Sequence, residues 1–206
     1  MPISTNEPER RLFPVFFLAD ASGSMAENGK WKIIQEVLSQ CLQQLKDSPD
    51  PDFEVVITLL LLQNDGVAVE HHSEPVEQVA IQNYSTSGQS NYSAGIEKLL
   101  DLLKENKLPK NAHVPCLVLM GDGHVDSSFM YTLDKCLKDA FFKKSTRIVV
   151  EIGNDFEPNA LRNFVSSPNN FFTVMDMSTM PYFYMRLASS INSQAIQSQS
   201  RRILQD

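Results

Sequence analysis

Apolar residues in this chain fall into short continuous runs and into runs with helical spacing. The runs at residues 12–19, 53–62 and 114–120 are almost wholly apolar, which is typical of strands buried on both faces of a parallel sheet. Shorter apolar runs predict further strands at residues 67–71, 147–152 and 171–174. Apolar positions with a period near 3.6 predict helices at residues 30–46, 91–106, 127–142, 159–165 and 182–197.

Strands that alternate with helices predict an α/β fold, a three-layer, doubly wound, Rossmann-like domain with a mostly parallel central sheet. Gln63-Asn64-Asp65-Gly66 predicts a hairpin turn, because Asp-Gly tolerates the positive φ that such turns need. Residues 67–71 would then form one antiparallel edge strand. We expect a single domain over residues 1–206, with its core at about 12–193 and polar tails at 1–10 and 198–206.

Polar side chains follow two of the strongest apolar runs. Asp20-Ala21-Ser22-Gly23-Ser24 follows the first, and Gly121-Asp122-Gly123 follows the run at 114–120. In open α/β sheets, ligands bind at the carboxyl ends of strands, where the strand order reverses. If the two strands are neighbours, the carboxylates converge and repel each other unless a proton or a cation lies between them. Ser22 and Ser24 favour a cation, although Asp20 and the serines could instead only cap the next helix.

The Asp20–Ser24 segment resembles the Asp-x-Ser-x-Ser motif of von Willebrand factor A (VWA) domains, which carry a metal-ion-dependent adhesion site (MIDAS). In that family a second loop, typically Gly-Gly-Thr-Asn, supplies a Thr hydroxyl. Gly88-Gln89-Ser90-Asn91 is similar, with Ser90 in the place of the Thr. The third loop often reads Thr-Asp-Gly, so Asp122 matches its Asp and Gly121 replaces its Thr. The family often has a Glu where this chain has His124, which we interpret as a solvated loop residue rather than part of the site rim.

The resemblance implies a binding module and not an enzyme. Asp20, Ser22, Ser24 and Ser90 would hold Mg²⁺, or alternatively Mn²⁺ or Ca²⁺, and Asp122 would bind directly or through water. Another protein would then supply an Asp or Glu that replaces one metal-bound water. Two alternatives stay open, a metal-dependent phosphoester hydrolase and a scaffold with an empty metal site. Against the hydrolase, Ser22 stands where aspartate-nucleophile phosphatases have a second Asp, and no Gly-x-Ser-x-Gly elbow or P-loop occurs.

A narrower resemblance is to bacterial tellurium-resistance proteins of the TerY type, on the basis of the short single-domain format and the Arg10-Arg11 lead-in. It implies a cytoplasmic protein in a stress or phosphorylation-linked complex beside phosphatase and kinase partners. Residues 1–11 contain no apolar signal-peptide core, and no apolar run is long enough to cross a bilayer. The net charge of -7 argues against DNA or an anionic membrane as the main partner.

The remaining candidates for chemistry have simpler interpretations. Cys41, Cys116 and Cys136 have no metal-type spacing, and we interpret them as small buried apolar residues of a reducing compartment. We interpret Trp31, at the start of a predicted helix, as a packing residue. The pair His71-His72 follows the predicted edge strand, and we interpret it as surface.

Overall fold

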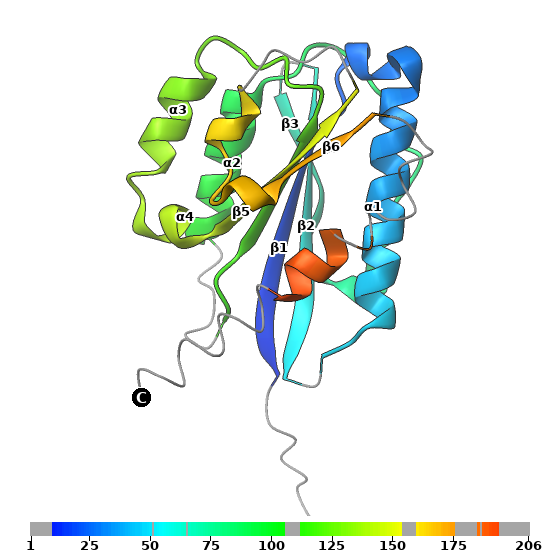
Figure 1. Cartoon of the computed structure of the whole chain (residues 1–206), viewed down its shortest axis with the longest axis vertical. Helices are drawn as coiled ribbons and strands as arrows, with labels where there is room; N and C mark the ends of the chain where they lie inside the picture. Colours follow the sequence, from blue (N-terminus) through cyan, green and yellow to red (C-terminus); the bar gives the residue numbers. More distant parts are fainter. Residues whose placement is uncertain are drawn as a thin grey trace, which may run out of the picture.

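The central sheet has six strands in the spatial order β3-β2-β1-β4-β5-β6, and β3 alone among them runs antiparallel to its neighbour (Figure 1). The computed structural model describes residues 10–50, 52–64, 66–105, 112–153, 160–175, 185 and 187–193. The strands are β1 (Arg11–Asp20), β2 (Phe53–Gln63), β3 (Gly66–Pro75), β4 (Cys116–Gly121), β5 (Thr146–Ile152) and β6 (Phe171–Val174). This arrangement confirms the predicted α/β fold with a mostly parallel sheet and one antiparallel edge strand.

Helices cover both faces of this sheet (Figure 1). The α-helices are α1 (Lys30–Asp47), α2 (Tyr92–Glu105), α3 (Phe129–Cys136) and α4 (Ala140–Lys144). The short 3₁₀ helices are η1 (Gly23–Gly29), η2 (Val76–Gln78), η3 (Leu161–Asn163) and η4 (Pro168–Asn170). Residues 185 and 187–193 are also helical, whereas the rest of the closing helix predicted at 182–197 lies outside the described residues. No helix among the described residues is long and apolar enough to span a membrane.

Two predicted helices differ from the structure. The helix predicted at 127–142 is two helices, α3 and α4, because Asp139 begins a new one: its carboxylate accepts hydrogen bonds from the N–H groups of Phe141 and Phe142. The helix predicted at 159–165 is the single 3₁₀ turn η3 within its described part. The edge strand β3 also continues to Pro75, beyond the predicted end at His71.

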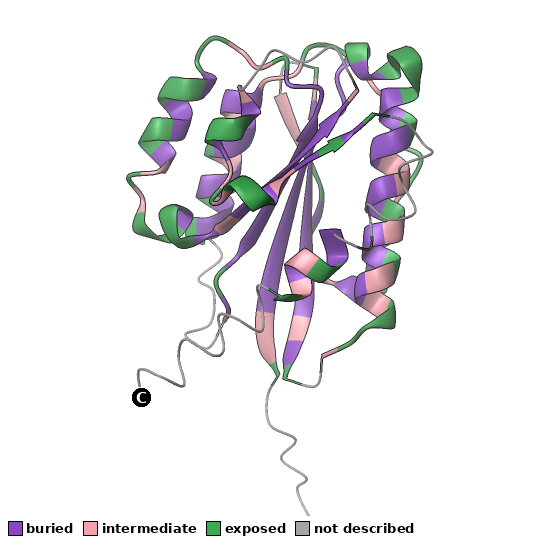
Figure 2. Ribbon diagram, viewed as in Figure 1, coloured by how far each residue is buried: buried purple, intermediate pink, exposed green. Residues whose placement is uncertain are grey.

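Alternate residues of each strand face opposite layers, so the core has two parts. Phe13, Val15, Phe17 and Ala19 of β1 pack in one cluster, with the buried side of α1 and residues of the closing helix. Phe16 and Leu18 of β1 point to the other face and pack with α2, α3 and α4. Figure 2 shows the buried residues concentrated along the strands and on the inner sides of the helices. The central strands are therefore held from both sides, which positions the loops at their carboxyl ends.

The three cysteines are free and buried, in α1, β4 and α3, as predicted. Burial raises the pKa of the Cys41 thiol to about 12. A thiol in this state is protonated at neutral pH and is a poor nucleophile and metal ligand. The cysteines of this chain therefore act as core residues.

Candidate functional site

Asp20 and Asp122 leave neighbouring strands at the same edge of the sheet. β1 and β4 run parallel, and Ala19 pairs with Met120 immediately before the two acidic loops begin. The chain reaches β2 on one side of β1 and later returns to β4 on its other side, so the strand order reverses here. The predicted adjacency of the two strands is confirmed, and both carboxylates are almost fully buried.

Backbone hydrogen bonds join the Asp20–Ser24 loop to the Ser87–Ser90 loop. The Gly23 N–H donates to the Gly88 carbonyl over 2.9 Å, and the Ser87 N–H donates to the Ala21 carbonyl over 2.9 Å. The hairpin turn after β2 joins them as well, because the Asn64 N–H donates to the Ser87 carbonyl over 3.0 Å. These contacts place Ser90 beside Ser22 and Ser24 although about 70 residues separate them in the sequence.

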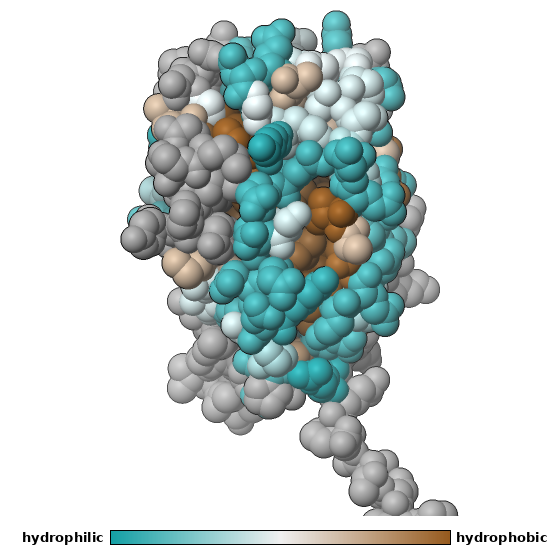
Figure 3. Space-filling view, turned by 90° about the vertical axis from the view of Figure 1, so that its right-hand side faces the viewer, coloured by the Kyte–Doolittle hydropathy of each residue, from teal (hydrophilic) through white to brown (hydrophobic). Residues whose placement is uncertain are grey.

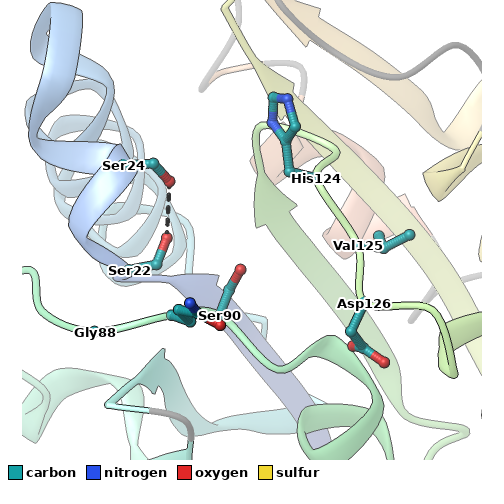
Figure 4. Close-up of a pocket in the computed structure, with 8 residues that line it drawn as sticks. Ser22, Ser24, Gly88, Ser90, His124, Val125 and Asp126 are labelled. Carbon is teal, nitrogen blue, oxygen red and sulfur yellow. Dashed lines mark hydrogen bonds between the residues drawn. The ribbon is translucent and has the colours of Figure 1, made fainter.

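A pocket of about 420 Å³ opens where the three loops meet (Figure 4). Ser22, Ser24 and Ser90 line it from two loops, together with Gly88 and Gln89, and His124, Val125 and Asp126 line it from the third. The hydroxyl oxygens of Ser22 and Ser24 are 3.1 Å apart, and the Ser90 hydroxyl points into the space between these serines and the third loop (Figure 4). Asp20 and Asp122 are not among the residues that line the pocket; they lie buried at the strand ends from which two of its loops start.

Both oxygens of Asp20 accept hydrogen bonds. Its Oδ1 accepts from the Ser22 N–H over 2.9 Å, and its Oδ2 accepts from the Tyr92 hydroxyl over 2.8 Å. Burial raises the pKa of Asp20 above its ordinary value, the charge of Asp122 adds to this, and the hydrogen bonds from Ser22 and Tyr92 offset it only in part. A carboxylate can accept about four hydrogen bonds. Asp20 therefore keeps acceptor capacity and would gain from a nearby cation.

Tyr92, the first residue of α2, is a site residue that the sequence did not reveal. Its side chain is fully buried, and burial together with Asp20 and Asp122 raises the pKa of its hydroxyl well above the ordinary value. The hydroxyl therefore keeps its proton and donates to Asp20. A Cβ atom at Gly121 would clash with this hydroxyl and would come within 3.0 Å of the Asp20 Cβ. The buried Tyr92 hydroxyl therefore leaves no room for a side chain at position 121.

Asp122 is bound from two directions. The Lys30 Nζ lies 3.1 Å from its Oδ2, while the N–H and the Nδ1 of His124 lie 3.3 Å and 3.1 Å from its Oδ1. Burial by itself raises the pKa of Asp122, but the hydrogen bonds from Lys30 and His124 outweigh it, so its pKa lies below the ordinary value. The interpretation of His124 as only a solvated loop residue was wrong, because this half-exposed ring both lines the pocket and contacts Asp122.

Lys30 was also missed by the sequence reasoning. It begins α1, where the positive end of the helix dipole disfavours a cation. An amphipathic lysine at such a place is usually solvated, yet Lys30 is buried against Asp122. A lysine at the start of a predicted helix was therefore the sequence signal that a carboxylate binds Lys30.

Asp126 is a third carboxylate at the pocket. Its oxygens accept hydrogen bonds from the N–H and the hydroxyl of Ser93 and from the N–H and the hydroxyl of Ser128. Asp126 thus holds the first turn of α2 against the turn that precedes α3. Its sequence signal was Asp-x-Ser before a helix, a common capping pattern. Because four donors already satisfy its oxygens, we interpret Asp126 as a positioning residue for the Ser90 loop.

The donor atoms at this site suit a hard divalent cation. Three serine hydroxyls line the pocket and two carboxylates lie buried at the strand ends beneath its loops, and oxygen donors of this kind are those that Mg²⁺, Mn²⁺ and Ca²⁺ bind. Within the described ranges, no group of three or more His, Cys, Asp or Glu side chains could hold a metal ion. A metal at this place would therefore depend on the serine hydroxyls as well as on the carboxylates.

The interpretations of Trp31 as a packing residue and of His71 as a surface residue have different outcomes. Trp31 is a packing residue as predicted: it is 8% exposed, and its Nε1–H donates to the Tyr84 carbonyl. The interpretation of His71 as a surface residue was wrong. Its ring is buried and lies between the Glu74 carboxylate, 2.9 Å from Nδ1, and the Tyr84 hydroxyl, 3.2 Å from Nε2. His71 belongs to β3 at the edge of the sheet and does not line the pocket.

Solved structures with the same fold include proteins that hold divalent metals. Proximal thread matrix protein 1 from the mussel byssus, with a zinc-occupied MIDAS motif, superimposes with a TM-score of 0.63 at 14% identity, covering 87% of this chain and 45% of that one. The manganese-loaded TRAP protein of Plasmodium vivax gives 0.61 at 17% identity, covering 83% and 71%. The pilus adhesin SpaC of Lactobacillus rhamnosus GG gives 0.70 at 10% identity, covering 89% and 31%. The chain thus spans less than half the length of two of these three proteins.

A sequence comparison identifies the family. No protein of curated function matches the chain by sequence. The sequence model of the von Willebrand factor type A domain, however, matches residues 15–186, which include all three loops of the pocket. The match agrees with the fold and with the Asp-x-Ser-x-Ser segment at the end of β1. The chain belongs to the von Willebrand factor type A domain family.

Proposed function

We propose that this chain is a metal-dependent protein-binding module. Asp20, Ser22, Ser24 and Ser90 would hold a divalent cation, with Asp122 as a direct or water-mediated ligand. The observation that carries the proposal is the pocket in which the serine hydroxyls of two distant loops meet beside the buried carboxylates. When bound, the cation would offer an open coordination position to an acidic side chain of a partner protein.

The residues of the chain have distinct roles in this proposal. The Ser22 N–H and the Tyr92 hydroxyl orient the Asp20 carboxylate, so its remaining acceptor sites face a fixed direction. Three neutral hydroxyls add oxygen donors without adding negative charge, which leaves the site able to attract an outside carboxylate. His124 and Gln89 line the pocket and would contact the partner. We propose Mg²⁺ as the cation because it commonly keeps exchangeable waters, and the zinc and manganese of the similar structures support a divalent ion.

The cellular setting is a separate part of the proposal. On the resemblance of the Arg10-Arg11 segment we propose a role like that of TerY-type proteins, in a cytoplasmic stress or phosphorylation-linked complex. The net charge of -7 supports a protein partner over nucleic acid.

Thermal melting with and without Mg²⁺ tests the metal site. A ligand present at 100 times its Kd and bound only to the folded chain stabilises it by about 2.7 kcal/mol, which corresponds to roughly 5–10 °C for a chain of this size. Asp20→Ala and Ser24→Ala should reduce this shift, whereas Ser127→Ala, an exposed serine outside the pocket, should not. Equal melting of the wild-type chain in EDTA and in excess Mg²⁺ would contradict the proposal.

Capture of partners from a cell lysate tests the binding role. The wild-type chain should retain a partner in Mg²⁺ and release it in EDTA, and Asp20→Ala should retain it in neither. A partner held equally under all conditions would place the binding surface away from the metal. Turnover of a phosphoester by the wild-type chain, lost in Asp20→Ala, would instead support the hydrolase alternative.

A further inference from the structure

Lys30 forms a buried ion pair inside the candidate metal site. Its Nζ lies 3.1 Å from the Asp122 Oδ2, and the two side chains are only 8% and 2% exposed. The aliphatic part of Lys30 passes close to Gly153 at the end of β5. The ammonium group thus reaches Asp122 from the α1 side of the sheet, while Tyr92 reaches Asp20 from the α2 side.

The ion pair changes the charge that the site presents to a metal. Asp20 and Asp122 carry two negative charges when ionised, and Lys30 neutralises one of them. Lys30 also uses acceptor capacity of the Asp122 Oδ2, while His124 uses that of Oδ1. Because charges interact strongly where water is excluded, a buried ammonium beside a ligand carboxylate opposes the entry of a second cation.

We propose that Lys30 is a tethered cation that competes with the divalent metal for Asp122. Lys30 holds Asp122 in place in the metal-free chain, and it must release or share this carboxylate when the metal binds. The site is therefore formed before the metal arrives, and its metal affinity is low. This inference rests on the proposed metal site and adds a residue that sets its affinity.

Binding of Mn²⁺ alone to the full-length chain tests this role, with the paramagnetic resonance signal of free Mn²⁺ as the measurement. Lys30→Met removes the charge at similar length and should tighten Mn²⁺ binding by roughly tenfold or more, since one opposing charge is lost. Lys32→Met removes an exposed lysine two positions further along α1 and should leave the affinity within about twofold. Asp20→Asn should abolish binding in both the wild-type and the Lys30→Met background.

A second variant keeps the test decisive if Lys30→Met alone folds poorly. The double variant Lys30→Met with Asp122→Asn removes both charges of the buried pair. The net charge of the site is then the same as in the wild-type chain, where Lys30 neutralises Asp122, and Asp20 and the hydroxyls remain as ligands. Its Mn²⁺ affinity should lie near the wild-type value and below that of Lys30→Met. If Lys30→Met does not fold, the double variant alone decides. Loss of Mn²⁺ binding in the double variant would overturn the inference, because it would show that Asp122 binds the metal in the wild-type chain although Lys30 is present.

The outcomes separate this inference from the proposed function. Wild-type binding that Asp20→Asn abolishes, with unchanged or weaker binding by a folded Lys30→Met, would overturn the competition and leave the metal site intact. Tight binding by Lys30→Met alone would support the competition and overturn a metal-dependent function of the wild-type chain. No binding by either protein would overturn both.

Discussion

The behaviour of Asp20 follows from burial without a countercharge. Asp122 has the Lys30 ammonium 3.1 Å from its Oδ2, whereas Asp20 accepts hydrogen bonds from neutral groups of Ser22 and Tyr92. The pKa of Asp20 is consequently raised, mainly by burial, and that of Asp122 is lowered, because the bonds from Lys30 and His124 outweigh burial. The contributions of these two carboxylates to the free energy of unfolding therefore change in opposite directions with pH.

Asp20 should destabilise the metal-free chain at neutral pH. Because its pKa is higher in the folded chain than in the unfolded chain, the folded state binds more protons in the range between the two values. Its contribution to the free energy of unfolding therefore falls as the pH rises through that range, and the loss remains at higher pH. In EDTA at pH 7, Asp20→Asn should raise the Tm by roughly 2–4 °C, which corresponds to about 1 kcal/mol.

Thermal melting of the wild-type chain and Asp20→Asn at lower pH tests whether the raised pKa of Asp20 causes the difference in Tm. The advantage of Asp20→Asn should shrink as the pH falls toward the unfolded-state pKa of about 3.9, and it should vanish below that pH, where the carboxyl is protonated in both states. Asp134→Asn, at an exposed acid on α3, should change the Tm little at either pH. A wild-type chain more stable than Asp20→Asn in EDTA at pH 7 would show that the hydrogen bonds to Asp20 outweigh its burial.

Among the elements, the loops after β1 and before α2 are as important as the strands. Gly88 adopts a φ of +62°, and a Cβ atom there would lie 2.5 Å from the Cα of Asn64 in the hairpin turn. Its carbonyl accepts the hydrogen bond from Gly23 that joins the two serine loops. A side chain at Gly88 would push the Ser90 loop away from the turn and thus open the pocket.

Gly88→Ala should lower both stability and Mg²⁺ affinity. The left-handed conformation alone costs an alanine about 1–2 kcal/mol, and the clash with the Asn64 backbone adds to this. Gly29→Ala is the matched control, because Gly29 has a φ of +71° with no atom within 4 Å of a new Cβ. Urea unfolding and Mg²⁺ titration of both variants test this: only Gly88→Ala should lose metal affinity, and equal losses of stability would show that the loop contact is unimportant.

Across the whole molecule, stability comes from two hydrophobic clusters and not from the site. One cluster joins the sheet to α1, and the other joins it to α2, α3 and α4. Figure 3 shows a largely hydrophilic outer face with a hydrophobic hollow near its middle. The site occupies only the carboxyl end of the sheet, where Lys30 already neutralises one of its acids.

Removal of metal should therefore leave the fold intact. In EDTA the circular dichroism spectra of the wild-type chain, in the far and near ultraviolet, should match those in Mg²⁺, and only the Tm should fall. The reason is that core burial supplies the main stabilisation and does not depend on the ion. Loss of the near-ultraviolet signal in EDTA would instead make the metal a requirement for folding.

Much of the architecture could be predicted from the sequence because local patterns carry it. Apolar runs, together with the hairpin turn before β3, identified the six strands of the described sheet, and helical spacing identified α1 and α2 to within a residue or two. The break between α3 and α4 was not predicted, because the apolar spacing continues through it and Asp139 is a cap only in the folded geometry. Ser22, Ser24 and Ser90 could be named in advance because their motif lies in order along the chain.

The sequence by itself determined the fold class, the three strands that are buried on both faces and the three loops that carry the candidate ligands. Each of these follows from periodicity or from contiguous residues. Only the tertiary structure decided what surrounds the two carboxylates. Lys30 and Tyr92 reach these carboxylates from the starts of α1 and α2. Contacts between residues 72 or 92 positions apart leave no local pattern, because they depend on how the crossovers place those elements around the end of the sheet.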